Sequence, residues 1–228
     1  MAQKEVTLLL SSALICLCLW AFFAIAGEAG EPEHQPLEAK ILRAMRKADD
    51  PGRIVGPVWA GEAARDLSAL GGPQITTLLV VLVTCYLAAR GRKREAVLVA
   101  AAVVGGVWLD EVLKQFFQRP RPTVVPHLMD AGDFSFPSGH SMNAAVVYLT
   151  LGVLLARSAG GWRARVFFVA AGLWLSGLVG VSRVMLGVHY PTDVLAGWTA
   201  GLGWALACRV VADLFWPDRA ALESTGEA

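Results

Sequence analysis

The chain has 228 residues, of which 55% are hydrophobic, and its formal net charge is +1. This hydrophobic content excludes an ordinary soluble domain, and apolar runs of roughly 20 residues, the length that crosses a hydrocarbon core, recur along the chain. The sequence has no basic cluster with interleaved aromatic residues, so we do not expect nucleic-acid binding. We expect an all-α polytopic membrane protein whose partner is the lipid bilayer.

The apolar runs predict about six transmembrane helices, near residues 6–26, 74–89, 96–117, 138–157, 166–188 and 194–215. A cleaved signal peptide is the alternative for the first run, which ends in small residues. Its length exceeds the usual signal core of about 7–15 residues and favours a retained helix. The cysteines lie within apolar runs, which is typical of packing residues rather than of disulfides or metal ligands: Cys16, Cys18, Cys85 and Cys208.

Residues 27–72 form the only long hydrophilic segment before the polar tail. Two stretches within it have helical periodicity and predict short amphipathic helices at the membrane interface. The expected apolar faces are Leu37, Ile41, Ala44 and Met45 in the first, and Trp59, Ala63, Leu67 and Leu70 in the second. These helices either form a wall over a site at the membrane surface or act as a spacer that covers helix ends.

Two short basic loops predict the orientation of the bundle. Residues 90–94 read Arg-Gly-Arg-Lys-Arg, and the loop between the fourth and fifth spans carries Arg157, Arg163 and Arg165. The positive-inside rule places both loops in the cytoplasm. Residues 1–228 then form one six-helix domain, with residues 27–72 as an extracytoplasmic loop and residues 216–228 as a cytoplasmic tail.

This orientation brings three polar stretches to the extracytoplasmic face. The first ends the third span, where Lys114 lies near the apolar region and Arg121 follows seven positions later. Lysine and arginine both suit phosphate oxygens, and the alternative is a pair of cations that snorkel to the interface. Asp110 and Glu111 precede Lys114 by about one helical turn and either support it or face outward as interfacial acids.

The second stretch is Pro137-Ser138-Gly139-His140, which opens the fourth apolar run. It predicts a helix start with Ser138 free to cap, and the unpaired N–H groups there suit an anion. The third stretch closes the fifth span and contains Arg183, His189 and Asp193. An aspartate four residues after a histidine can hold the imidazole in one tautomer, or it can merely cap the next helix.

Together the three stretches supply cations, a helix N-terminus and two histidines on one membrane face. No cluster of carboxylates stands in the sequence to hold a metal, so we expect no cofactor. This set suits metal-free phosphoryl transfer, in which hydrogen-bond donors neutralise the charge on the equatorial oxygens.

The chain resembles the type-2 phosphatidic acid phosphatase superfamily, also called lipid phosphate phosphatases. The signature of that family is Lys, six residues, Arg-Pro; then Pro-Ser-Gly-His; then Ser-Arg, five residues, His, three residues, Asp. This sequence matches it with Lys114 and Arg121-Pro122, Pro137 to His140, and Ser182-Arg183 with His189 and Asp193. The neighbouring Arg119-Pro120 has the wrong spacing from Lys114, so Arg121 is the preferred ligand.

The resemblance implies a role for each matched residue. His189 would attack phosphorus to form a phosphohistidine, Asp193 would orient His189 and stabilise its positive form, and His140 would protonate the leaving group and then help to activate water. The implied phosphate-binding residues are Lys114, Arg121, Ser138, Gly139 and Arg183.

The implied activity is that of a lipid phosphate or pyrophosphate phosphatase in the bacterial inner membrane, with its active site facing the periplasm or exterior. Phosphatidic acid, phosphatidylglycerophosphate and undecaprenyl pyrophosphate are the candidate substrates, because the motifs bind the phosphate and leave the lipid tail open. A lipid phosphotransferase is an alternative. The spans argue against a vanadium haloperoxidase, which in this superfamily is soluble and larger. A transporter or a non-catalytic lipid-binding scaffold is a further alternative, and the His189–Asp193 pair argues against the scaffold, which needs no nucleophile. The oligomeric state stays open.

Overall fold

The computed structural model describes residues 2–29 and 35–216, and this part of the chain is all-α, with no strand. The predicted tail, residues 216–228, lies outside the described residues except for Trp216. The helices are α1 (Ala2–Ala29), α2 (Gln35–Ala44), α3 (Ala60–Ala69), α4 (Pro73–Ala89), α5 (Lys93–Phe117), α6 (Gly139–Ser158), α7 (Trp162–Met185) and α8 (Pro191–Phe215).

The prediction of about six transmembrane helices is confirmed, with one span divided. Helices α1, α5, α6, α7 and α8 are each long and apolar enough to cross a membrane. The sixth candidate is α4, which passes the same test only when it is taken together with α3, from which it is bent by 43°. The break has a local cause, because Gly71 and Gly72 precede Pro73, which takes the first helical position of α4.

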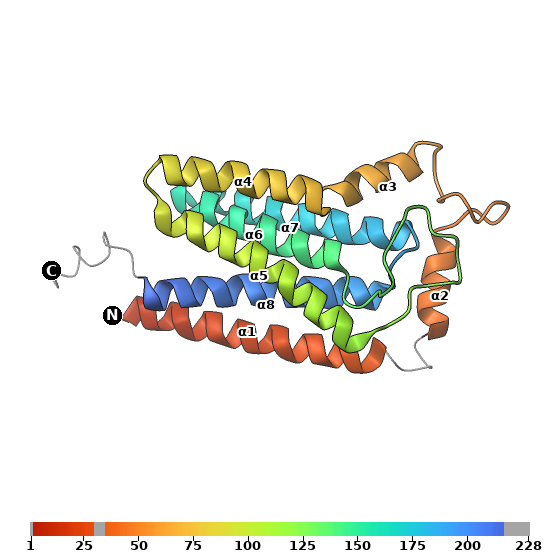
Figure 1. Cartoon of the computed structure of the whole chain (residues 1–228), viewed down its shortest axis with the longest axis horizontal. Helices are drawn as coiled ribbons and strands as arrows, with labels where there is room; N and C mark the ends of the chain where they lie inside the picture. Colours follow the sequence, from red (N-terminus) through yellow and green to blue (C-terminus); the bar gives the residue numbers. More distant parts are fainter. Residues whose placement is uncertain (1, 30–34, 217–228) are drawn as a thin grey trace.

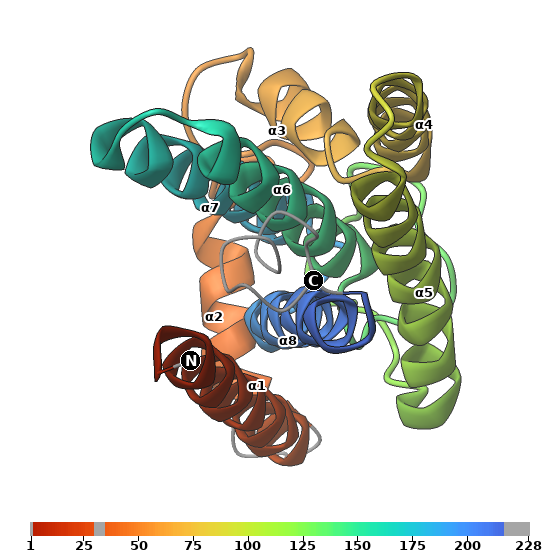
Figure 2. The ribbon, with the colours of Figure 1, turned by 90° about the vertical axis from the view of Figure 1, so that its left-hand side faces the viewer.

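Helix α6 is the central element of the bundle, and α4, α5, α7 and α8 all contact it (Figures 1 and 2). The small-residue spacing of α8 makes one of these contacts close. A Cβ atom on Gly197 would lie 2.6 Å from the Ser138 carbonyl oxygen, and one on Gly201 would lie 2.6 Å from that of Met142. Glycine therefore allows the backbones of α6 and α8 to approach near the start of α6.

Helix α1 packs along α8 (Figure 2). Phe22 is buried against the rings of Phe117 and Phe136, with centroid separations of 5.9 and 5.7 Å. The four cysteines, all described, are free thiols. Cys18 is buried, whereas Cys16 and Cys85 are exposed on the outer surface of the bundle, so only part of this set packs inside the protein.

The two short helices of the hydrophilic segment are present, but the expected apolar faces are only partly correct: Ile41 and Leu70 pack against the core, whereas other members of the two faces are exposed. Leu37 is 60% exposed and Trp59 is 64% exposed. The buried faces are instead Glu38, Ala39 and Leu42 on α2, and Ala60, Ala64 and Ser68 on α3. Both helices lie at one end of the bundle (Figure 1), where polar partners from the loops and helix ends decide which face turns inward.

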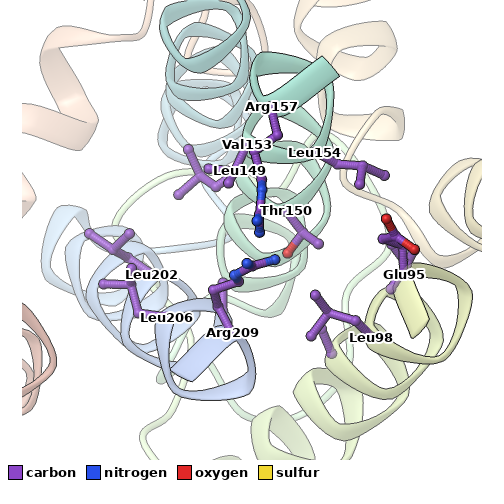
Figure 3. A pocket seen from close by; sticks show the side chains of 13 residues that line it. Glu95, Leu98, Leu149, Thr150, Val153, Leu154, Arg157, Leu202, Leu206 and Arg209 are labelled. Atoms are coloured by element: carbon purple, nitrogen blue, oxygen red, sulfur yellow. The ribbon is translucent and has the colours of Figure 1, made fainter. Parts of the chain in front are cut away.

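The opposite end of the bundle holds both basic loops, the start of α1 and the end of α8 (Figure 1). Between α5, α6 and α8 it encloses a mostly apolar cavity of about 90 Å³. Arg157 and Arg209 point into this cavity beside Thr150 (Figure 3). None of the predicted catalytic or phosphate-binding residues is among the residues that line it.

Candidate active site

A cavity of about 360 Å³ lies where α5 and α7 end and α6 begins. The structure brings side chains or backbone from all three predicted stretches to its wall: Lys114, Arg121, Gly139, His140, Arg183 and His189. Asp193 and Ser138 are fully buried and lie outside this lining. The residues chosen from separate parts of the sequence therefore converge on one polar hollow.

His189 lies in the short connection between α7 and α8, which turns at Gly187 with φ of +75°. Its side chain is nearly fully buried, and its Nε2 atom is 3.2 Å from Nη1 of Arg121. Because a guanidinium can only donate, Nε2 accepts in this contact and carries a lone pair. The other ring nitrogen, Nδ1, is 3.4 Å from Oδ2 of Asp193.

The pKa of His189 is well below its usual value of 6.5. Burial is the largest cause, followed by the positive charges of Arg183, Arg121 and Lys114. The expectation that Asp193 would favour the imidazolium is outweighed, because these effects all disfavour a positive ring. At neutral pH the free protein therefore holds His189 as a neutral imidazole, which is the nucleophilic form.

Asp193 makes both of the contacts that its sequence position allowed. Its Oδ2 accepts the backbone N–H of Tyr190 at 2.9 Å, which caps the start of α8. The same oxygen faces Nδ1 of His189 at 3.4 Å, within the range of an ion pair but longer than a good hydrogen bond. Capping fixes the carboxylate, and the fixed carboxylate then faces the imidazole.

Lys114 is held by Asp110, one helical turn earlier on α5. Nζ of Lys114 lies 2.5 Å from Oδ2 of Asp110, and the two side chains are 18% and 17% exposed. A Cβ atom on Gly139 would lie 2.5 Å from each of these two atoms. Only glycine leaves room at the start of α6 for the ion pair. Glu111 instead accepts from Gln115 at 2.9 Å and lines the cavity.

The two arginines of the site are fixed by neutral acceptors. Arg121 donates through Nη1 to the Val188 carbonyl oxygen at 2.7 Å and through Nε to that of Gly132. Arg183 donates through Nη1 to Oγ of Ser68 on α3 at 2.7 Å. None of these contacts neutralises the charge of either guanidinium, so both arginines can bind an anion in the cavity.

Ser138 differs from its expected role as a side-chain cap. Among the described residues its hydroxyl makes no capping hydrogen bond, and instead it accepts from Oγ of Ser141 at 2.9 Å. The backbone N–H of Ser138 donates to the Asp193 carbonyl oxygen at 2.9 Å. Ser138 thus ties the start of α6 to the start of α8 from behind the cavity wall.

Three residues of the site region were not expected from the sequence: Glu38, Ser68 and Arg119. Glu38 and Ser68 were not among the residues of the expected apolar faces, and both are buried against arginines. Arg119 was passed over because its spacing from Lys114 did not match. Glu38, Leu42 and Arg46 are all buried and are spaced four residues apart, as expected for one face of a helix. This spacing is the signal that would have identified Glu38.

The comparisons with known proteins agree with this fold. A family model described as the PAP2 superfamily matches residues 95–216, more than half of the chain. The chain therefore belongs to the PAP2 superfamily. Phosphatidylglycerophosphatase B of Bacillus subtilis strain 168 is 34% identical over 151 residues, which cover 65% of this chain and 73% of that protein.

Two further relatives carry other names. Undecaprenyl-diphosphatase BcrC of Bacillus subtilis strain 168 is 30% identical over 53% of this chain and 60% of its own length. Lipid A 1-phosphatase of Rhizobium johnstonii is 35% identical, but over only 45% of this chain and 42% of its own length. The crystal structure of a transmembrane PAP2-type phosphatidylglycerolphosphate phosphatase from Bacillus subtilis is 26% identical. It matches with a TM-score of 0.80, over 90% of this chain and 98% of that one.

Proposed function

We propose that this protein is a metal-independent phosphatase of lipid phosphates or diphosphates that acts through a phosphohistidine on His189. The observation that carries the proposal is the buried, neutral imidazole whose Nε2 atom contacts Arg121 beside a cavity lined by further cations. The named activities of the relatives support the substrate class, which includes phosphatidylglycerophosphate, undecaprenyl diphosphate and lipid A phosphate. Phosphatidic acid belongs to the same chemical class.

In the first step Nε2 of His189 attacks phosphorus, a nitrogen–phosphorus bond forms and the bond from phosphorus to the lipid-side oxygen breaks. His140, at the start of α6 on the cavity wall, takes up a proton when the anionic substrate binds and donates it to that departing oxygen. In the second step water attacks the phosphohistidine and gives its proton to His140. The nitrogen–phosphorus bond breaks and inorganic phosphate leaves.

The cations of the chain supply the charge stabilisation. Lys114, Arg121 and Arg183 face the oxygens of the transferred phosphoryl group, and the Gly139 backbone joins them at the start of α6. Asp193 offsets the positive charge that His189 gains as it binds phosphorus. Ser138 contributes by holding the start of α6 in place, since its hydroxyl is buried against Ser141 and Ser138 is not among the residues that line the cavity.

The membrane orientation follows from the two basic loops. They lie at the end of the bundle opposite the cavity, so the positive-inside rule turns the cavity toward the extracytoplasmic side. The protein is then a single membrane domain of a bacterial plasma membrane. Residues 27–72 lie outside and the tail from residue 216 lies inside.

The test is phosphate release by the detergent-purified protein, with a chelator present, from phosphatidic acid, phosphatidylglycerophosphate and undecaprenyl pyrophosphate. We expect release from at least one lipid, and its loss in His189→Ala. His127→Ala is the matched control, because His127 is an exposed histidine outside the cavity lining. Activity that survives in His189→Ala, or that strictly requires added metal, would contradict the proposal. Consumption of lipid without phosphate release would indicate phosphotransfer instead.

A further inference from the structure

Arg119 is the ion-pair partner of the carboxylate that faces His189. Its Nη1 atom donates to Oδ1 of Asp193 at 2.5 Å and to Oγ1 of Thr192 at 2.8 Å. The guanidinium carbon also lies 4.1 Å from the centre of the Tyr190 ring. Arg119 stands behind the His189–Asp193 pair, on the side away from the cavity, and is not among the residues that line the cavity.

Glu38 fixes Arg119 from the hydrophilic segment. Its Oε2 atom accepts from Nη2 of Arg119 at 2.7 Å, and its Oε1 atom accepts from the hydroxyl and the backbone N–H of Thr192 at 2.5 and 3.2 Å. The side chain of Glu38 is 5% exposed and that of Arg119 is 12% exposed. A carboxylate so deeply buried is costly unless it is paired, so helix α2 is docked by this contact.

The net charge of the cluster formed by Asp193, Glu38 and Arg119 is opposite in sign to the charge that His189 would gain on phosphorylation. Asp193 and Glu38 carry two negative charges and Arg119 carries one positive charge, which leaves one negative charge beside His189. A phosphorylated imidazole gains about one positive charge relative to the neutral ring. Without Arg119 two buried carboxylates would share the site, and like charges at short range favour uptake of a proton by one of them.

We infer that Arg119, held by Glu38, is a positioning residue that keeps Asp193 ionised and directed at Nδ1 of His189. This inference rests on the proposed role of His189 as the nucleophile. Arg119 fixes one carboxylate oxygen and the Tyr190 N–H fixes the other, which lies 3.4 Å from Nδ1 of His189. Helix α2 becomes part of the catalytic support rather than a spacer over helix ends.

The kinetic test compares Arg119→Gln, Arg119→Lys and Glu38→Gln, with Arg43→Gln as the control from the exposed face of α2. In Arg119→Gln we expect kcat to fall about 10- to 100-fold, as for other partners that orient a reacting histidine, with KM nearly unchanged. Arg119→Lys should recover part of kcat because it keeps the charge. Glu38→Gln should show a smaller loss, and the double variant Glu38→Gln/Arg119→Gln should be no worse than Arg119→Gln alone.

The second readout does not depend on turnover. The chain has four histidines, so the imidazole ¹⁵N resonances of the solubilised protein can be assigned with His189→Gln. We expect His189 to be protonated at Nδ1 and free at Nε2 in the native chain, and to become a mixture of tautomers in Arg119→Gln.

The outcomes separate the two proposals. If the native protein releases no phosphate but the His189 tautomer depends on Arg119, the phosphatase proposal fails and the positioning role stands. If the native protein is active and Arg119→Gln matches Arg43→Gln in kcat and in the His189 resonances, the positioning role is overturned. Should Arg119→Gln fail to fold, Arg119→Lys and Glu38→Gln decide the question by the same two readouts.

Discussion

His189 lies where desolvation and the charge of its neighbours act in the same direction. Burial disfavours the imidazolium, and three cationic side chains disfavour it further. The same cations that would bind a phosphoryl group therefore also keep the attacking nitrogen unprotonated. An anion that enters the cavity would offset their charge, so the imidazole becomes easier to charge when the substrate is bound.

We predict that His189 makes the protein less stable in acid. In the unfolded chain a histidine binds a proton near pH 6.5, whereas the pKa of the folded His189 lies well below that value. The unfolded state binds more protons below about pH 6.5, so the free energy of unfolding falls as the pH drops, by up to about 1.4 kcal/mol per pH unit.

The measurement is the thermal midpoint of the solubilised protein between about pH 6.5 and about pH 5. It should fall in the native chain and fall less in His189→Gln. The same pH dependence in both proteins would show that the buried imidazole is not the source.

Gly139 sets the space for the Lys114–Asp110 pair, so a methyl group there should displace Lys114. In Gly139→Ala the added Cβ atom would lie 2.5 Å from Nζ of Lys114. We expect kcat/KM to fall about 100-fold, the scale that a displacement of about 1 Å produces in a positioned site. Gly177→Ala on α7 is the control, because no atom lies within 4 Å of its added Cβ. Equal activity of the two variants would contradict the role of the glycine.

Helices α2 and α3 lie at the site end of the bundle, and each buries a polar side chain against an arginine. Glu38 on α2 pairs with Arg119, and Ser68 on α3 accepts from Arg183. The sequence left open whether this segment was a wall or a spacer. The contacts show how each helix supports the site: Ser68 holds Arg183, which lines the cavity, and Glu38 holds Arg119, which binds the carboxylate that faces His189.

Loss of the Ser68 hydroxyl should leave Nη1 of the buried Arg183 with only the weak acceptor Sδ of Met129, at 2.8 Å. An unsatisfied buried group costs about 1–3 kcal/mol, so Ser68→Ala should lower the thermal midpoint. It should also weaken binding of inorganic phosphate as an inhibitor, because Arg183 is no longer held toward the cavity. Ser158→Ala is the control from the far end of α6, where the serine is exposed. Unchanged stability and unchanged inhibition would exclude a supporting role for Ser68.

Across the whole molecule, the sequence predicted the spans and the convergence of the site residues because both depend on strong local patterns. Long apolar runs define spans, and the motifs at the ends of α5 and α7 and the start of α6 follow from chain order. The docking of α2 and α3 was not predictable in the same way. The buried face of each helix depends on a partner that is distant in the sequence, Arg119 for α2 and Arg183 for α3. The apolar periodicity of ten residues therefore predicted a face that is rotated from the buried one.

The proposed orientation can be tested with two single-cysteine variants, made after replacement of the four native cysteines by alanine. Val58→Cys places a thiol on the segment between α2 and α3, where Val58 is 82% exposed. Gly160→Cys places one in the loop between α6 and α7. On intact cells a membrane-impermeant thiol reagent should label Val58→Cys and should reach Gly160→Cys only after permeabilisation. The reverse pattern would contradict the orientation.

The contact between Glu38 and Thr192 also constrains the order in which the protein is made. The two residues are 154 positions apart, so at about 5–20 residues per second the ribosome needs roughly 8–30 s to supply the partner. During that interval Glu38 must stay hydrated at the membrane surface, because burial without Arg119 and Thr192 would leave its carboxylate without a partner. Helix α2 can therefore dock only after the last span has been inserted, and closure of the site marks the end of assembly.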